Sequence, residues 1–214
     1  MTEPVFKNPA GKLIAWAGFL AAGFLLAAAC SVALSRHVEQ MRFDHPWTYL
    51  KEAERREAEN NWVGALTMLK EAARRDPVSP EPHERAGLLH YNHQQWDQAL
   101  DSYRAALDRG SREADVRGKI VWCLIHLGNY SGAAEFGEAC IEEGYRFPNM
   151  HRYVAEAYRR AGNDKASIPH FEKALEGFPN DLYLMERIVQ AYRKTDKPQK
   201  ADAMQRRIQR LMEQ

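Results

Sequence analysis

The sequence repeats every 34 residues from Pro46 onward, and this period constrains the fold more than any other feature of the chain. One column of the repeat is aromatic and holds Trp62, Trp96 and Tyr130. Three further columns hold mostly small residues: Ala53, Gly87, Val121, Ala155 and Val189; Ala65, Ala99, Ala133, Ser167 and Ala201; and Ala72, Ala106, Cys140, Ala174 and Ile208. A fixed period of this length, held without an insertion, predicts that identical supersecondary units stack side by side.

Each unit has the internal pattern of a helical hairpin. Two apolar-periodic stretches flank a short polar turn, which reads AENNW, NHQQW, HLGNY, RAGND and KTDKP in successive units. The second stretch typically ends at proline or glycine, residues that stop a helix. Small residues let two helices pack closely, and stacked hairpins share one core. The chain is therefore predicted to be all-α, with helix–turn–helix units at residues 46–79, 80–113, 114–147, 148–181 and 182–214.

The period, the small-residue columns, the aromatic column and the terminal prolines together resemble the tetratricopeptide-repeat (TPR) family over residues 46–214. The resemblance implies a right-handed superhelical solenoid of five TPR hairpins, in which the first helix of each hairpin lines a concave groove. In the family, that groove takes extended or helical peptides. Two units depart from the family pattern, because Asp164 and Pro198 stand in the aromatic column.

By repeat position, the resemblance places candidate partner-binding residues in this groove: Arg85, Tyr91, Lys119, Trp122, His126, Arg152, Tyr153, Arg159, Arg187 and Arg193. The same first helices also contribute Lys51, Glu54, Leu88, Asn92, Ile125, Glu156, Gln190 and Lys194. Aromatic residues anchor many protein interfaces. We therefore expect Tyr91, Trp122 and Tyr153 to form an aromatic floor.

Charge is distributed unevenly along the units. Residues 46–147 carry 13 basic and 17 acidic residues, whereas residues 148–214 carry 13 basic and 9 acidic residues. The net charge therefore changes from −4 to +4 along the repeats. The basic end favours an acidic peptide segment or a C-terminal carboxylate as its ligand. The alternative is that these charges only keep the solenoid soluble.

A different kind of segment precedes the repeats. Residues 13–34 form an uncharged, largely apolar run of 22 residues. As a helix this run would extend roughly 33 Å, enough for a bilayer core of about 30 Å. It is predicted to be a transmembrane helix between a short tail (1–12) and a linker (35–45). Lys7 and Lys12 favour a cytoplasmic N-terminus, which would place the repeats on the periplasmic side of a bacterial inner membrane.

Two other interpretations of residues 13–34 stay open. The sequence from Leu26 to Cys30, LAAAC, resembles the cleavage site of a bacterial lipoprotein, and cleavage there would leave a lipidated Cys30. Against this, the apolar run continues through Leu34, where a mature lipoprotein usually turns polar. The third interpretation is a plain secretory signal that is cut after a small residue.

The sequence shows no constellation of the kind that an enzyme needs. GxSxG, HExxH and Walker motifs are absent from it. His90 and His93 fit a solvated turn better than a metal site, and Cys123 and Cys140 fit small buried apolar residues. We therefore expect no catalysis, no cofactor and no metal. The net charge of +1 gives no reason to expect nucleic acid as a partner.

These observations favour a membrane-anchored scaffold that binds other proteins and assists the assembly of a membrane or envelope complex. The alternative hypothesis is a TPR lipoprotein, lipidated at Cys30, that acts as a structural or assembly subunit of a pilus or secretion apparatus. Both hypotheses expect protein partners and contact with a membrane through residues 13–34.

Overall fold

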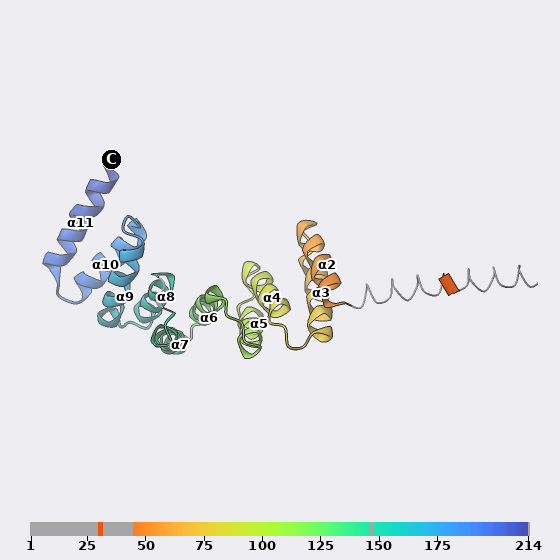
Figure 1. Cartoon of the computed structure of the whole chain (residues 1–214). Helices are drawn as coiled ribbons and strands as arrows, with labels where there is room; N and C mark the ends of the chain where they lie inside the picture. The colour runs from red at the N-terminus through yellow and green to blue at the C-terminus, as the bar shows by residue number, and fades with distance from the viewer. Residues whose placement is uncertain (1–29, 32–44, 146–147, 214) are drawn as a thin grey trace, which may run out of the picture.

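The computed structural model describes residues 30–31, 45–145 and 148–213, and from residue 45 onward the regular structure in these ranges is helical. Figure 1 shows the helices following one another in space in the same order as in the sequence. The helices are α2 (Pro46–Ala58), α3 (Trp62–Arg75), α4 (Glu81–Asn92), α5 (Trp96–Asp108), α6 (Ala114–His126), α7 (Tyr130–Glu142), α8 (Pro148–Arg160), α9 (Asp164–Gly177), α10 (Leu182–Lys194) and α11 (Pro198–Met212).

The helices pack in consecutive pairs, α2 with α3, α4 with α5, and so on to α10 with α11. Each pair also contacts the next pair along the chain. Such short connections between paired helices make antiparallel hairpins, and hairpins that contact only their neighbours form a solenoid. The expected all-helical solenoid is therefore confirmed.

A left-handed residue and a capping residue form the turn inside each hairpin. The backbone angle φ is positive at the same repeat position in every unit: Asn60, Gln94, Gly128, Gly162 and Asp196. In three units the next residue is an asparagine, Asn61, Asn129 or Asn163, whose side chain accepts a hydrogen bond from a backbone N–H in the first turn of the second helix. Asparagine is among the best residues at this position, because it satisfies a helical N–H that has no other partner. The polar turns of the sequence thus fix where each second helix begins.

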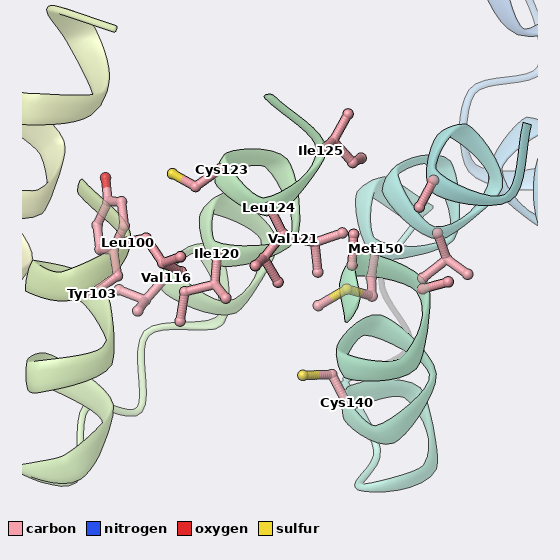
Figure 2. Packing of buried hydrophobic residues seen from close by; sticks show 14 of the residues in the cluster. Leu100, Tyr103, Val116, Ile120, Val121, Cys123, Leu124, Ile125, Cys140 and Met150 are labelled. Atoms are coloured by element: carbon pink, nitrogen blue, oxygen red, sulfur yellow. The ribbon is translucent and has the colours of Figure 1, made fainter. Parts of the chain in front are cut away.

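The three small-residue columns lie in the core. All their members are buried, including the larger side chains of Val121, Val189 and Ile208. Larger residues fill the space beside them. Figure 2 shows Tyr103, Ile120, Val121 and Met150 in the cluster that joins α5, α6, α7 and α8. Cys123 and Cys140 are buried free thiols, as the sequence indicated.

The aromatic column connects neighbouring units. Trp62 stacks on His93 with ring centroids 4.2 Å apart, and Trp96 stacks on His126 at the same distance. In each case the ring at the start of a second helix meets a residue at the end of the first helix of the following unit. This contact recurs along the chain and helps to hold the units in register.

The predicted transmembrane segment, residues 13–34, lies outside the described residues except for Cys30 and Ser31. Cys30 is exposed and has a free thiol. Within the part of the chain that the structure describes, no helix has the length and apolar character needed to cross a membrane. The transmembrane helix and its two alternatives therefore stay predictions.

Candidate protein-interaction groove

The ten candidate residues all lie on α4, α6, α8 and α10, the first helices of units two to five. We call the surface that these helices form together the first-helix face. Two features of this face have the character of a binding site: a row of aromatic rings in units two to four, and a pair of arginines around one tyrosine in units four and five.

The aromatic row consists of five rings in sequence: Tyr91, Trp96, His126, Trp122 and Tyr153. Tyr91 meets Trp96 edge-on at 5.4 Å between centroids, and Trp96 stacks on His126 at 4.2 Å. Trp122 lies 5.0 Å from His126 and 5.4 Å from Tyr153. The row includes Trp96, which the first-helix columns did not include, because it begins a second helix. Such a row gives partly exposed apolar area with fixed geometry, as interface anchors require.

The tyrosine hydroxyls of the row stay neutral. Burial raises the pKa of Tyr91, and the neighbouring Tyr153 adds to this effect. Burial also raises the pKa of Tyr153, and the nearby carboxylate of Asp115 acts in the same direction. A neutral hydroxyl both donates and accepts hydrogen bonds, so the row combines apolar faces with polar edges.

Arg152 and Arg187 both contact the ring of Tyr183. Two cations beside one ring make this part of the first-helix face a candidate site for an anion. Their guanidinium carbons are 5.2 Å and 4.6 Å from its centroid. Arg152 also approaches Asp181 at 3.6 Å. Arg187 donates to the side chain of Gln190, but its buried Nε has no hydrogen-bond partner in the structure. Arg187 is therefore a candidate cation without a carboxylate partner among the described residues.

Several other candidate cations are already paired within the protein. Arg85 contacts Glu54 at 3.1 Å and Glu57 at 3.0 Å, and Lys119 pairs with Asp115. Lys194 contacts Asp164 at 3.0 Å. These candidate cations are consequently less available to an acidic ligand than the sequence count indicated.

Glu156 and Ile125 are buried, although their repeat positions placed them among the groove residues. Glu156 accepts hydrogen bonds from Arg159 and Arg160 at 2.6–2.8 Å. Burial acts to raise the pKa of Glu156, but these two arginines outweigh it and hold the pKa below its usual value. Arg159 therefore donates its hydrogen bonds to a buried carboxylate, and this arginine is less available to a partner. Arg193 is exposed on α10.

The structure contains a polar cluster between α7, α8 and α9 that the sequence did not predict. His170 Nε2 lies 2.9 Å from Glu138, and its Nδ1 lies 3.2 Å from Nδ1 of His151. The hydroxyl of Tyr158 donates to the same glutamate at 3.1 Å. No spacing in the sequence pointed to this cluster, because its members come from three helices. Among the described residues, no three histidine, cysteine or carboxylate side chains are placed to hold a metal ion.

The packing of paired helices around small-residue columns defines a helical-repeat solenoid. Comparison with known proteins shows what this solenoid resembles. Residues 84–144 match the family model of the tetratricopeptide repeat. The signal recognition particle subunit SRP72 of Caenorhabditis elegans is 42% identical over 55 residues, which are 26% of this chain. The match covers only 8% of that protein.

Solved structures share the solenoid over most of its length. MamA from Desulfovibrio magneticus RS-1, in a form that begins at residue 41, has a TM-score of 0.70 and 18% identity, with 78% of this chain and 95% of that chain covered. YrrB, described as a TPR protein with an unusual peptide-binding site, has a TM-score of 0.69 and 16% identity, with 80% and 89% covered. At these identities the likeness shows the fold alone. The described helices therefore have the fold of these TPR-like solenoids.

Proposed function

We propose that this protein is a scaffold that binds a segment of another protein along its first-helix face. The observation that carries the proposal is the continuous aromatic row from Tyr91 to Tyr153, followed by Arg152 and Arg187 around Tyr183. Rings supply contact area at low entropic cost, and arginine holds a carboxylate with two parallel hydrogen bonds. A partner segment with apolar side chains and an acidic residue fits this order of features.

The acidic residue of the partner is expected at Arg187. This arginine has no ion pair among the described residues, whereas Arg159 and Lys194 each have a carboxylate partner. Its ring neighbour Tyr183 is itself exposed, so a ligand can reach the ring that lies beside this arginine. The proposal thus narrows the broad basic end to one arginine and its immediate surroundings.

We further propose that residues 13–34 hold the solenoid at a membrane, with the repeats on the periplasmic side. The uncharged run of 22 residues supports this proposal. The scaffold would then keep its partner near the membrane while an envelope complex assembles. In the alternative, a lipoprotein subunit, the exposed Cys30 would carry the lipid. Mass spectrometry of the native N-terminus distinguishes the two, because only the second predicts a diacylglyceryl group on Cys30.

The test of partner binding compares single variants of the full chain. The chain is purified from its own membranes with its associated proteins, and the affinity of an identified partner is then measured by titration calorimetry. Arg187→Ala and Trp122→Ala should each weaken binding by roughly tenfold to thirtyfold, the loss typical of an interface hot spot.

Arg206→Ala is the matched control, because it removes the same charge from an exposed position on α11. It should leave the affinity unchanged. Circular-dichroism melts separate lost binding from lost folding, which matters for the partly buried Trp122. If Arg187→Ala and Trp122→Ala both fold normally and bind with wild-type affinity, the first-helix face is not the binding site.

A further inference from the structure

A pocket of about 160 Å³ opens between α4 and α6, the first helices of units two and three. Its apolar walls are Leu88 on α4 and Val116 on α6. Tyr103 of α5 also lines it and is only 1% exposed, so this ring is almost wholly buried beside the pocket. Figure 2 shows the ring of Tyr103 beside Val116. The volume is sufficient for one side chain and too small for a folded element.

The charges around the pocket do not cancel. Lys119 is paired with Asp115, and Arg85 is held by two glutamates of α2. Glu84 on α4 and Glu113 at the start of α6 also line the pocket, and neither has an ion-pair partner among the described residues. The pocket therefore carries excess negative charge, which attracts a cation.

The hydroxyl of Tyr103 is a buried polar group that the fold does not use. It has no hydrogen-bond partner in the structure. The ring cannot easily turn away, because it is so close to α4 that a Cβ atom on Gly87 would lie 2.6 Å from its Cδ1 and Cε1. Burial raises the pKa of Tyr103, so the hydroxyl stays neutral. A buried polar group without a partner destabilises the fold, and a donor on a ligand would recover part of this cost.

We propose that this pocket holds one lysine or arginine side chain of the bound protein. Leu88 and Val116 contact the aliphatic stem, the hydroxyl of Tyr103 accepts a hydrogen bond from the cationic head, and Glu84 and Glu113 neutralise its charge. A side chain with an apolar stem and a charged tip matches this combination.

The inference rests on the proposed function, since it assigns a second contact to the same partner. The partner's acidic residue is proposed to bind Arg187 in unit five, and its basic residue would bind between units two and three. Together these two contacts would fix the direction in which the partner lies along the solenoid. Neither contact needs the other in order to be measured, so the two proposals can fail separately.

The test uses a single-residue probe and the full chain in deuterated detergent micelles. The probe is Nα-acetyl-lysine methylamide, and its norleucine analogue has nearly the same stem but no charge. Saturation-transfer NMR should show that the lysine probe binds and that the norleucine probe binds about tenfold more weakly, as expected for the loss of charge-assisted hydrogen bonds.

Two variants locate the binding. Glu84→Gln with Glu113→Gln should weaken the lysine probe about tenfold. Tyr103→Phe keeps the ring against Gly87 and removes only the hydroxyl, so it should weaken the probe about threefold without lowering the melting temperature. The matched control is Glu142→Gln with Glu143→Gln, which neutralises two exposed carboxylates at the end of α7 and should change nothing.

Equal binding of the lysine and norleucine probes would overturn the inference, and so would unchanged lysine binding in the double glutamine variant. Both results are independent of the proposed function, because the partner protein is absent from the probe experiment. Failure of the proposed function would instead appear as wild-type partner affinity in Arg187→Ala and Trp122→Ala. The two sets of measurements therefore distinguish a wrong pocket from a wrong binding face.

Discussion

Asp164 occupies the repeat position that holds tryptophan or tyrosine in the first three units. Its contact with the following unit nevertheless falls at the end of that unit's first helix, as the contact of Trp96 does. Trp96 stacks on His126 at the end of α6, and Asp164 pairs with Lys194 at the end of α10. An ion pair replaces a ring stack at an equivalent position. Both partners differ from those in units two and three, and the contact between neighbouring units is kept.

His151 provides a prediction about pH at the scale of the single residue. Burial lowers its pKa below the usual 6.5, and the charge of His170 acts in the same direction. Lys173 also lowers this pKa, while Glu138 and Glu176 oppose the shift. The unfolded chain therefore takes up a proton near pH 6.5, whereas the folded chain resists it until the pH is lower.

The sign of the effect follows from this difference in proton uptake. Where the unfolded state binds more protons, the free energy of unfolding rises with pH. The contribution of neutral His151 is thus complete above about pH 6.5 and is lost as the pH falls below that value. Thermal melts should show that the melting temperature falls less between pH 7.5 and pH 5.5 for His151→Asn than for the wild type. An equal difference in the two proteins would contradict the assignment.

At the scale of the helix, α4 and α5 are held at a distance that only glycine allows. A Cβ atom at Gly87 would meet the ring of Tyr103 at 2.6 Å, and one at Gly137 would meet Cγ2 of Val154 at 2.3 Å. Glycine inside a helix costs about 1 kcal/mol relative to alanine. Close packing against a large neighbour accounts for glycine at both positions.

Gly87→Ala should therefore destabilise the protein, although alanine is the better helix former. The gain in helix propensity is about 1 kcal/mol, whereas overpacking a tight core typically costs about 1–3 kcal/mol. A net loss of about 1 kcal/mol would lower the melting temperature by roughly 2–4 °C in a chain of this size. The matched test is the double variant with Tyr103→Leu, in which the alanine should no longer be harmful relative to Tyr103→Leu alone. A higher melting temperature for Gly87→Ala would refute this account.

At the scale of the whole molecule, the solenoid separates its features along its length. The unused carboxylates Glu84 and Glu113 lie near units two and three, the aromatic row spans units two to four, and Arg187 lies in unit five. Because each unit contacts mainly its neighbours, such features keep a linear order. An extended partner would meet them one after another.

The position of this solenoid relative to the membrane is a prediction for the whole chain. If residues 13–34 span the bilayer with the N-terminus inside, a C-terminal fusion to alkaline phosphatase should be active in a bacterial host, because the enzyme folds only outside the cytoplasm. A fusion to a reporter that works only in the cytoplasm should be inactive. The opposite pair of results would overturn the periplasmic orientation.

The sequence by itself determined the repeating part of this protein. The 34-residue period, the small-residue columns and the polar turns predicted the all-helical solenoid, since these positions make the same local contacts in every unit. Repeat position also placed all ten candidate residues on first helices. Contacts of this kind depend on spacing within and between adjacent units, and spacing is visible in a sequence.

Only the tertiary structure decided which of these side chains form ion pairs within the protein and which do not. Arg85 has carboxylate partners, whereas Arg187, at the equivalent position in unit five, has none among the described residues. The histidine cluster and the pocket above Tyr103 likewise join residues that vary from unit to unit. Such contacts depend on the rotamers and neighbours of non-repeating residues on separate helices, and no periodicity in the sequence records them.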